Sequence, residues 1–180
     1  MGVAERRAMG AGFVPEERYG HAAIKEMSLK DNALLTTSQK LNLVKKGFLH
    51  SNEICDLTHK IISDFDVRTT GLEMETGNLS GGNLQKFILG REILQNPRIL
   101  IVSQPTWGVD AGAAVFLRKS LLDLAARGCA ILIISQDLDE IFEICDRIAV
   151  LYQGTLSPLI NTESASVHQI GLLMGGKTTE

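Results

Sequence analysis

The stretch Leu79-Ser80-Gly81-Gly82-Asn83, followed by apolar residues at helical spacing through residue 94, decides the fold of this chain. A serine before the first apolar turn is a favoured N-cap, so the pentapeptide marks the start of a helix. Two glycines let the backbone approach a ligand closely, and the helix dipole favours negative charge at this end. The pattern favours a phosphate site, and a plain capped helix with Ser80 as N-cap is the alternative.

The sequence after this helix alternates between apolar runs and amphipathic stretches. The runs are solid rather than alternating, which is typical of parallel strands covered by helices on both faces. We therefore predict an α/β fold. The expected elements are a strand at 98–102, a helix at 111–126, a strand at 129–135, a helix at 138–145 and a strand at 147–152.

The sequence before the pentapeptide has a different hydrophobic pattern. Residues 12–15 look like a short strand closed by Pro15. From Ser28 to about residue 66 the pattern is helical, with Ser28 and Ser51 as N-cap candidates, and predicts a small helical subdomain. The weakly patterned tail predicts one helix over about 163–174. Charged side chains of residues 138–146, Glu140 among them, are interpreted as a solvated helix surface.

Bulk properties exclude several classes of function. The formal net charge of -3 provides no basic field for a nucleic-acid backbone. No apolar run approaches the roughly 20 residues needed to cross a bilayer, so we expect no direct insertion in the membrane. The three cysteines are odd in number and lie in apolar stretches, which favours reduced thiols and a cytoplasmic location. The four histidines show no ligand spacing, so we predict no metal site.

The pentapeptide resembles the signature motif of ATP-binding-cassette transporter ATPases. Three further stretches follow in the order of that family: residues 98–106 resemble the Walker B strand, 107–110 the D-loop, and 133–137 the switch region. Trp107 of the D-loop either contacts a partner or packs within this chain. Asp110 is interpreted as a helix N-cap, a hydrogen-bond partner across an interface, or both.

Two more stretches resemble one subgroup of this family. Residues 13–18 are similar to the Q-loop of the second, degenerate cassette in importers of simple sugars and nucleosides, and residues 170–174 to the tail of that cassette. The resemblance implies a partial P-loop NTPase fold, with a helix-flanked parallel sheet and a helical subdomain. It divides the chain into a Q-loop region at 1–27, a helical subdomain at 28–78, an ATPase core at 79–158 and a tail at 159–180.

Departures from the family pattern fall on catalytic positions. The resemblance places Ser103 and Gln104 where the family has the Asp that helps hold Mg²⁺ and the Glu that polarises water. Serine is a weak magnesium ligand, and glutamine cannot accept a proton. Gln136 replaces the switch histidine, and Glu16 replaces the Q-loop glutamine. No catalytic residue is assigned, and we expect the chain to be inactive alone.

The P-loop is also missing from its expected place, which would lie upstream of Met1. Residues 171–178 spell G-x-x-x-x-G-K-T literally, with Lys177 as the lysine. A working P-loop needs a strand before it and a helix after it, because the helix start supplies part of the phosphate field. Since the segment before this string is predicted to be helical and the chain ends two residues after it, we interpret the match as coincidence.

In this family two cassettes pair head to tail, and the signature of one closes over ATP held by the other. The resemblance thus implies ATP as ligand, with Mg²⁺ held mainly by a partner cassette, and a permease partner at the inner face of the membrane. The residues expected at the nucleotide are Leu79, Ser80, Gly81, Gly82, Asn83, Asp110 and Glu16. The alternatives are an active homodimeric ATPase, which requires phosphate binding by Lys177, and a remnant or interaction module that binds no nucleotide.

Overall fold

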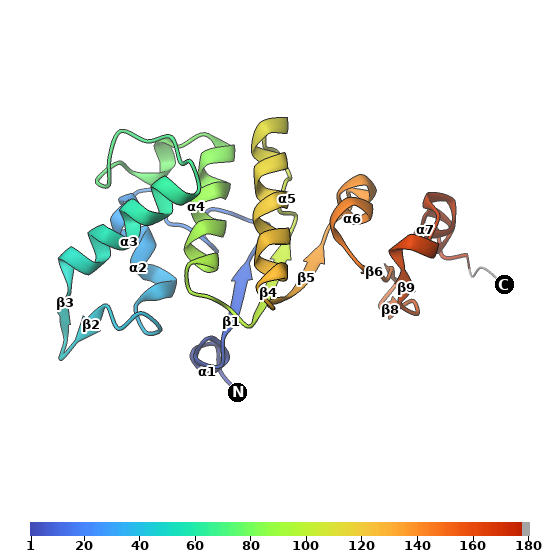
Figure 1. Cartoon of the computed structure of the whole chain (residues 1–180), viewed down its shortest axis with the longest axis horizontal. Coiled ribbons are helices and arrows are strands. Elements are labelled where there is room, and N and C mark those ends of the chain that lie inside the picture. Colours follow the sequence, from blue (N-terminus) through green and yellow to red (C-terminus); the bar gives the residue numbers. More distant parts are fainter. Residues whose placement is uncertain (178–180) are drawn as a thin grey trace. The chain divides into compact units, whose positions relative to one another are not determined.

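The computed structural model describes residues 1–177 and divides into two units, Met1–Ile134 and Ser135–Glu180 (Figure 1). The first unit contains the pentapeptide and the parallel sheet. The second begins after the last strand of that sheet. The finer division into four parts stays a prediction. No helix among the described residues is long and apolar enough to span a membrane.

The centre of the first unit is a parallel sheet of three strands in the order β1-β4-β5. The strands are β1 (Ala11–Val14), β4 (Ile99–Ser103) and β5 (Ala130–Ile134). The register places Phe13 opposite Ile101, and Ile101 opposite Leu132. The predicted strands at 98–102 and 129–135 are thus confirmed to within a residue at each end, and the α/β fold with them.

Two helices cover one face of this sheet. Helix α4 (Gly81–Ile93) packs on β1, and helix α5 (Ala111–Ala126) packs on β5 and on α4 (Figure 1). Val14, Leu100 and Val102 point to this side and are completely buried. The bounds of α5 agree with the sequence prediction at both ends, and those of α4 to within one residue.

The opposite face of the sheet is largely bare. Its side chains include Phe13, Ile99, Leu132 and Ile134, which are each about half exposed, between 47% and 54%. Parallel sheets are almost always buried on both faces. The expectation of helices on both sides is therefore met on one side only, because no helix of the first unit packs over this face. We call these four residues the bare sheet face.

The helical part between β1 and α4 contains α2 (Leu29–Thr37) and α3 (Ser51–Asp64). Ser28 is confirmed as the N-cap of α2, since its Oγ accepts the N–H of Asp31. Ser51 is the first residue of α3 rather than its N-cap. Between the helices lies a hairpin that the sequence did not predict, β2 (Val44–Lys45) and β3 (Phe48–Leu49).

A buried polar network ties this helical part to α4. Glu92, 1% exposed, accepts hydrogen bonds from Thr36 Oγ1 at 2.6 Å and from Arg7 Nη1 at 2.9 Å. Arg7 belongs to α1 (Val3–Ala8), and the neighbouring Arg91, also buried, donates to the carbonyl of Asn32 in α2 at 2.9 Å. Because a buried charge is tolerated only when it is paired, this network fixes α1 and α2 against α4.

The second unit contains α6 (Leu138–Ile144), α7 (Val167–Met174) and two short antiparallel pairs around a small core of Ile148, Val150 and Ile170. The pairs are β6 (Arg147–Ile148) with β9 (Ile160–Asn161), and β7 (Leu151–Tyr152) with β8 (Thr155–Leu156). The predicted single strand at 147–152 is therefore wrong. Gln153 and Gly154 have positive φ angles of 45° and 79° and turn the chain back on itself.

Two other expectations for this unit need correction. The tail helix is shorter than predicted, since residues Thr162–Ser164 form a separate 3-10 turn before α7. Glu140 is only 1% exposed rather than solvated, and neither of its carboxylate oxygens has a hydrogen-bond partner among the described residues.

Candidate functional site

The pentapeptide forms an open turn at the start of α4. Ser80 is the N-cap, and its Oγ accepts hydrogen bonds from the backbone N–H of Asn83 at 3.4 Å and from its side-chain Nδ2 at 2.9 Å. Leu79 and Gly82 are buried and anchor the turn, whereas Ser80 and Gly81 are exposed. The free N–H groups of the first helical turn are therefore presented beside an accessible serine and glycine.

The glycines at this turn are required by close neighbours. A Cβ on Gly82 would lie 3.2 Å from both Ala113 Cβ and Asp110 Oδ2. The starts of α4 and α5 therefore lie against each other, and the positive ends of two helix dipoles converge at this point. The Asp110 carboxylate occupies the start of α5, so the donors left free for an anion are those of α4.

Asp110 is the N-cap of α5, and its Oδ1 accepts the N–H of Ala113 at 2.9 Å. This backbone hydrogen bond is the main cause that lowers the pKa of Asp110, and the nearby Lys86 adds to the effect. The carboxylate is therefore ionised at neutral pH. Its capping role is observed, and its role across an interface stays a prediction.

A hollow of about 440 Å³ opens beside this turn. Within it Lys86 Nζ forms an ion pair with Asp66 at 2.9 Å and lies 4.9 Å from the ring centre of Phe116. Its charged side chains are two acidic and two basic, so the hollow as a whole is close to neutral. The lining residues are Asp66, Arg68, Ser80, Gly82, Asn83, Lys86, Asp110, Gly112, Ala113 and Phe116.

The end of β4 carries no carboxylate. Ser103 is its last residue and half-buried, and Gln104 is 8% exposed with a positive φ of 50°. The backbone N–H of Gln104 donates to the carbonyl of Ile134 at 2.8 Å. A hydroxyl and an amide do not fit the oxygen-rich, anionic shell that Mg²⁺ prefers. Among residues 1–177, no cluster of three or more His, Cys, Asp or Glu side chains could hold a metal ion.

Glu16 is exposed two residues after β1, and Arg18 connects its segment to helix α4 and to the D-loop. Arg18 Nε donates to Gln85 Oε1 of α4 at 2.9 Å, and Nη2 donates to the carbonyl of Trp107. Arg18 is not among the site residues predicted from the sequence. The only signal was its place within the Q-loop-like residues 13–18. Trp107 is 67% exposed, so most of this residue faces solvent.

The remaining predicted positions lie in the second unit. Gln136 precedes α6, whose N-cap is Asp137. Gly171 lies inside α7, and the N–H of Lys177 donates to the carbonyl of Leu172 at 2.9 Å just after that helix ends. The string G-x-x-x-x-G-K therefore closes a helix instead of opening one. Thr178, its last residue, lies outside the described residues.

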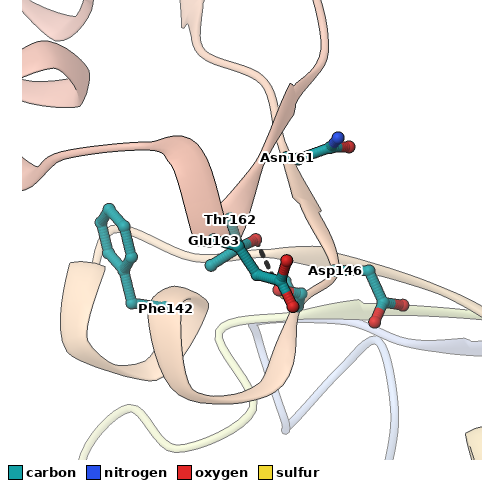
Figure 2. A pocket seen from close by; sticks show the side chains of 6 residues that line it. Phe142, Asp146, Asn161, Thr162 and Glu163 are labelled. Atoms are coloured by element: carbon teal, nitrogen blue, oxygen red, sulfur yellow. Dashed lines mark hydrogen bonds between the residues drawn. The ribbon is translucent and has the colours of Figure 1, made fainter.

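The second unit has a hollow of its own, of about 530 Å³, lined by Phe142, Cys145, Asp146, Asn161, Thr162 and Glu163. Figure 2 shows Thr162, whose Oγ1 donates to the carbonyl of Cys145 at 2.5 Å, between Phe142 and the two carboxylates. Burial raises the pKa of the Cys145 thiol to about 11, and the carboxylates of Glu140 and Asp146 contribute. None of the predicted nucleotide-binding residues lines this hollow.

Solved structures identify the architecture. A dimeric ATP-binding cassette in a post-hydrolysis state, bound to ADP and phosphate, superposes with a TM-score of 0.74 at 19% identity. That match covers 90% of this chain and 68% of the cassette. The chain has the fold of an ATP-binding cassette. A second dimeric structure of the same cassette, described as a bacterial ABC transporter cassette, gives a TM-score of 0.73 at 18% identity over the same shares of the two chains.

The sequence relatives of this chain are ATP-binding proteins of importers. The chain is 41% identical over 170 residues to a nucleoside import ATP-binding protein of Lactococcus lactis, and 38% identical over 169 residues to a guanosine import ATP-binding protein of Bacillus subtilis. A glucose import ATP-binding protein of Haloferax volcanii is 37% identical over 169 residues. These alignments cover 93–94% of this chain, which spans about a third of the length of the relatives. No family model matches the chain.

Proposed function

We propose that this chain belongs to the ATP-binding subunit of a nucleoside or sugar importer, where it acts as the signature side of a nucleotide site. In this role Ser80, Gly81 and Gly82 close over an ATP molecule that a partner cassette holds. The chain corresponds to the second, degenerate cassette of such a subunit. Nucleoside and sugar import are the functions named for the relatives.

The observation that carries the proposal is the accessible start of α4, with the start of α5 beside it. Backbone N–H groups at the start of α4 favour a phosphate of ATP, whereas the start of α5 is already capped by Asp110. Ser80 and Gly81 are exposed, so a nucleotide presented by another chain can reach them. Leu79 anchors this turn by burial, Asn83 donates to Ser80 Oγ, and Asp110 caps the neighbouring helix α5.

The residues at the end of β4 support a role in which this chain completes the nucleotide site of another chain. ATP hydrolysis needs Mg²⁺ and a group that activates water, and Ser103 with Gln104 supplies neither a carboxylate ligand nor a base. When bound, Mg²⁺ would be held by residues of the partner cassette and would neutralise negative charge on the phosphates of ATP. The half-site offered by this chain would contribute N–H donors and helix dipoles only.

The proposal includes two partners and a location. The first partner is another cassette in head-to-tail arrangement. The second is a transmembrane permease, contacted by the helical region at 28–78 and the segment of Glu16. With these two partners, the proposed location of the chain is the cytoplasmic side, peripheral to the inner face of the cell membrane.

The test is reconstitution of this chain with a complete cassette and the permease of a nucleoside importer. We expect co-purification and a nucleoside-stimulated ATPase activity that is lost on Ser80→Arg, because the arginine fills the exposed turn. Ser166→Arg is the matched control. Ser166 is likewise an exposed N-cap, whose Oγ accepts the N–H of Gln169 at 3.1 Å in α7.

Three results would contradict the proposal. One is the failure of the chain to associate with any complete cassette. The other is ATPase activity that survives Ser80→Arg as well as it survives Ser166→Arg, which would show that the turn does not contact nucleotide. Loss of activity in both variants would assign the effect to helix capping instead of the signature, and would also count against the proposal.

A further inference from the structure

We infer that Arg18 is a positioning residue of the signature half-site, which fixes the D-loop segment at Trp107 against the start of α4. This inference deepens the proposed function and rests on it. No nucleotide contact is required of Arg18 itself. Its role is to set the distance between two backbone segments that both face the nucleotide.

The Arg18 guanidinium lies against two segments that are far apart in the sequence, the first turns of α4 and the D-loop residues 107–108. Its Nε donates to Oε1 of Gln85 at 2.9 Å, and Gln85 is only 2% exposed on the second turn of α4. Its Nη2 donates to the backbone carbonyl of Trp107. Its Nη1 lies 3.1 Å from the point that a Cβ on Gly81 would occupy. The planar, rigid fork of an arginine suits such a junction better than a flexible lysine.

Gly81 leaves room for this junction. A Cβ at Gly81 would also lie 3.3 Å from the carbonyl oxygen of Gly108, so the D-loop backbone and the guanidinium press on the same side of the glycine. Gly108 has a positive φ of 63°, a conformation that glycine adopts without strain. Gly81 and Gly108 therefore allow the D-loop backbone to lie close to the start of α4, and Arg18 fixes this arrangement.

The backbone of Arg18 is itself fixed. Its carbonyl accepts the N–H groups of Ala22 at 3.1 Å and Ala23 at 2.8 Å. The neighbouring Tyr19 hydroxyl donates to the carbonyl of Thr76 at 3.0 Å, in the 3-10 turn η1 (Thr76–Asn78) just before the pentapeptide. Arg18 thus acts as a rigid spacer between the segment after β1 and the signature turn.

The charge of Arg18 also points to an anion. A cation near a helix N-terminus opposes the helix dipole, so its presence there is unfavourable for the helix alone. Partial burial lowers the pKa of Arg18, but an arginine stays protonated in proteins. The positive charge that the guanidinium adds beside Gly81 is offset when a phosphate arrives.

The test uses Trp107, the single tryptophan of the chain, as an intrinsic reporter of the D-loop. We expect Arg18→Gln to lower the fluorescence anisotropy of Trp107 and to increase its quenching by acrylamide, because the carbonyl of the same residue loses its donor. Arg18→Lys should give an intermediate anisotropy. Arg6→Gln, an exposed arginine in α1, is the control and should leave the signal unchanged.

The second readout is ATP hydrolysis in the reconstituted complex with a complete cassette and permease. Arg18→Gln should lower kcat by about tenfold, as expected when a positioned group is displaced, with co-purification unchanged. Arg18→Lys should retain more activity than Arg18→Gln. If circular dichroism shows that Arg18→Gln does not fold, the Trp107 anisotropy and the kcat of Arg18→Lys test the inference instead.

The outcomes separate this inference from the proposed function. Wild-type anisotropy in the folded Arg18 variants would overturn the inference, whatever the ATPase shows. A lower anisotropy with wild-type kcat would overturn it as well, because the D-loop position would then have no effect on hydrolysis. If Ser80→Arg leaves ATPase activity intact, the proposed function fails, and the fluorescence result still reports whether Arg18 holds Trp107.

Discussion

Gly90 in the middle of α4 lies directly against the ring of Phe65, so that a Cβ on the glycine would come within 2.6 Å of Phe65 Cδ2. Phe65 follows the end of α3 and packs edge to face on Phe116 of α5, with ring centres 6.2 Å apart and an interplanar angle of 77°. The glycine thus sets how closely the helical part approaches the helix that carries the signature.

Gly90→Ala should destabilise the first unit. The new methyl group overlaps a buried ring, and overpacking of this kind costs about 1–3 kcal/mol, more than the gain of up to about 1 kcal/mol in helix propensity. Gly171→Ala is the matched control, because Gly171 is also helical and a Cβ added to it would meet open space. We expect opposite shifts in the urea midpoint, and a stabilised Gly90→Ala would contradict this packing.

Asp110→Asn should change the pH dependence of stability. The folded pKa of Asp110 lies below its ordinary value of 3.8, so its stabilising contribution is complete above that value and is lost as the pH falls through the folded pKa. Asparagine can still cap the helix but has no charge. The urea midpoints of the two proteins should differ most at neutral pH and converge as the pH falls below the folded pKa, which lies under 3.8. A constant difference across this range would show that the carboxylate charge is not the cause.

Cys145 should be slow to alkylate in the folded chain. The rise in its pKa from 9.0 to about 11 lowers the thiolate fraction at pH 8 by roughly 100-fold. Iodoacetamide labelling followed by peptide mass spectrometry should show this slowing relative to the same cysteine in the urea-unfolded chain. Equal rates in the two states would rule out the burial beside Glu140 and Asp146.

Lys177→Ala should leave nucleotide affinity unchanged. Its segment follows the end of α7, where the helix dipole is negative and repels phosphate. Equilibrium binding of a fluorescent ATP analogue to the wild-type chain and the variant, each reconstituted with a complete cassette, is the measurement. A marked loss of affinity would revive the homodimeric ATPase as an alternative.

The sequence predicted best where local chemistry and tertiary packing agree. Helix α5 begins after Asp110, a strong N-cap, and continues with good helix formers to Ala126, so both bounds could be predicted. The run at 147–152 was misread, because an apolar run does not show whether its partner is parallel or antiparallel. The hairpin at 44–49 was missed because its turn, Lys46-Gly47, lacks the more usual Asn-Gly pair.

The candidate site was predicted in part for a similar reason. Ser80 and Asp110 act on backbone groups three residues ahead, which local sequence can indicate. Arg18 acts on Gln85 and Trp107, 67 and 89 residues away. Contacts at such separation depend on the finished fold, and no local pattern around Arg18 specifies them.

The bare sheet face has a consequence for how residues 1–180 behave in solution. Phe13, Ile99, Leu132 and Ile134 together form an exposed apolar surface of the type that marks a site of interaction or of aggregation. We therefore expect these residues, when studied without any polypeptide that covers the sheet, to associate with one another as the protein concentration rises.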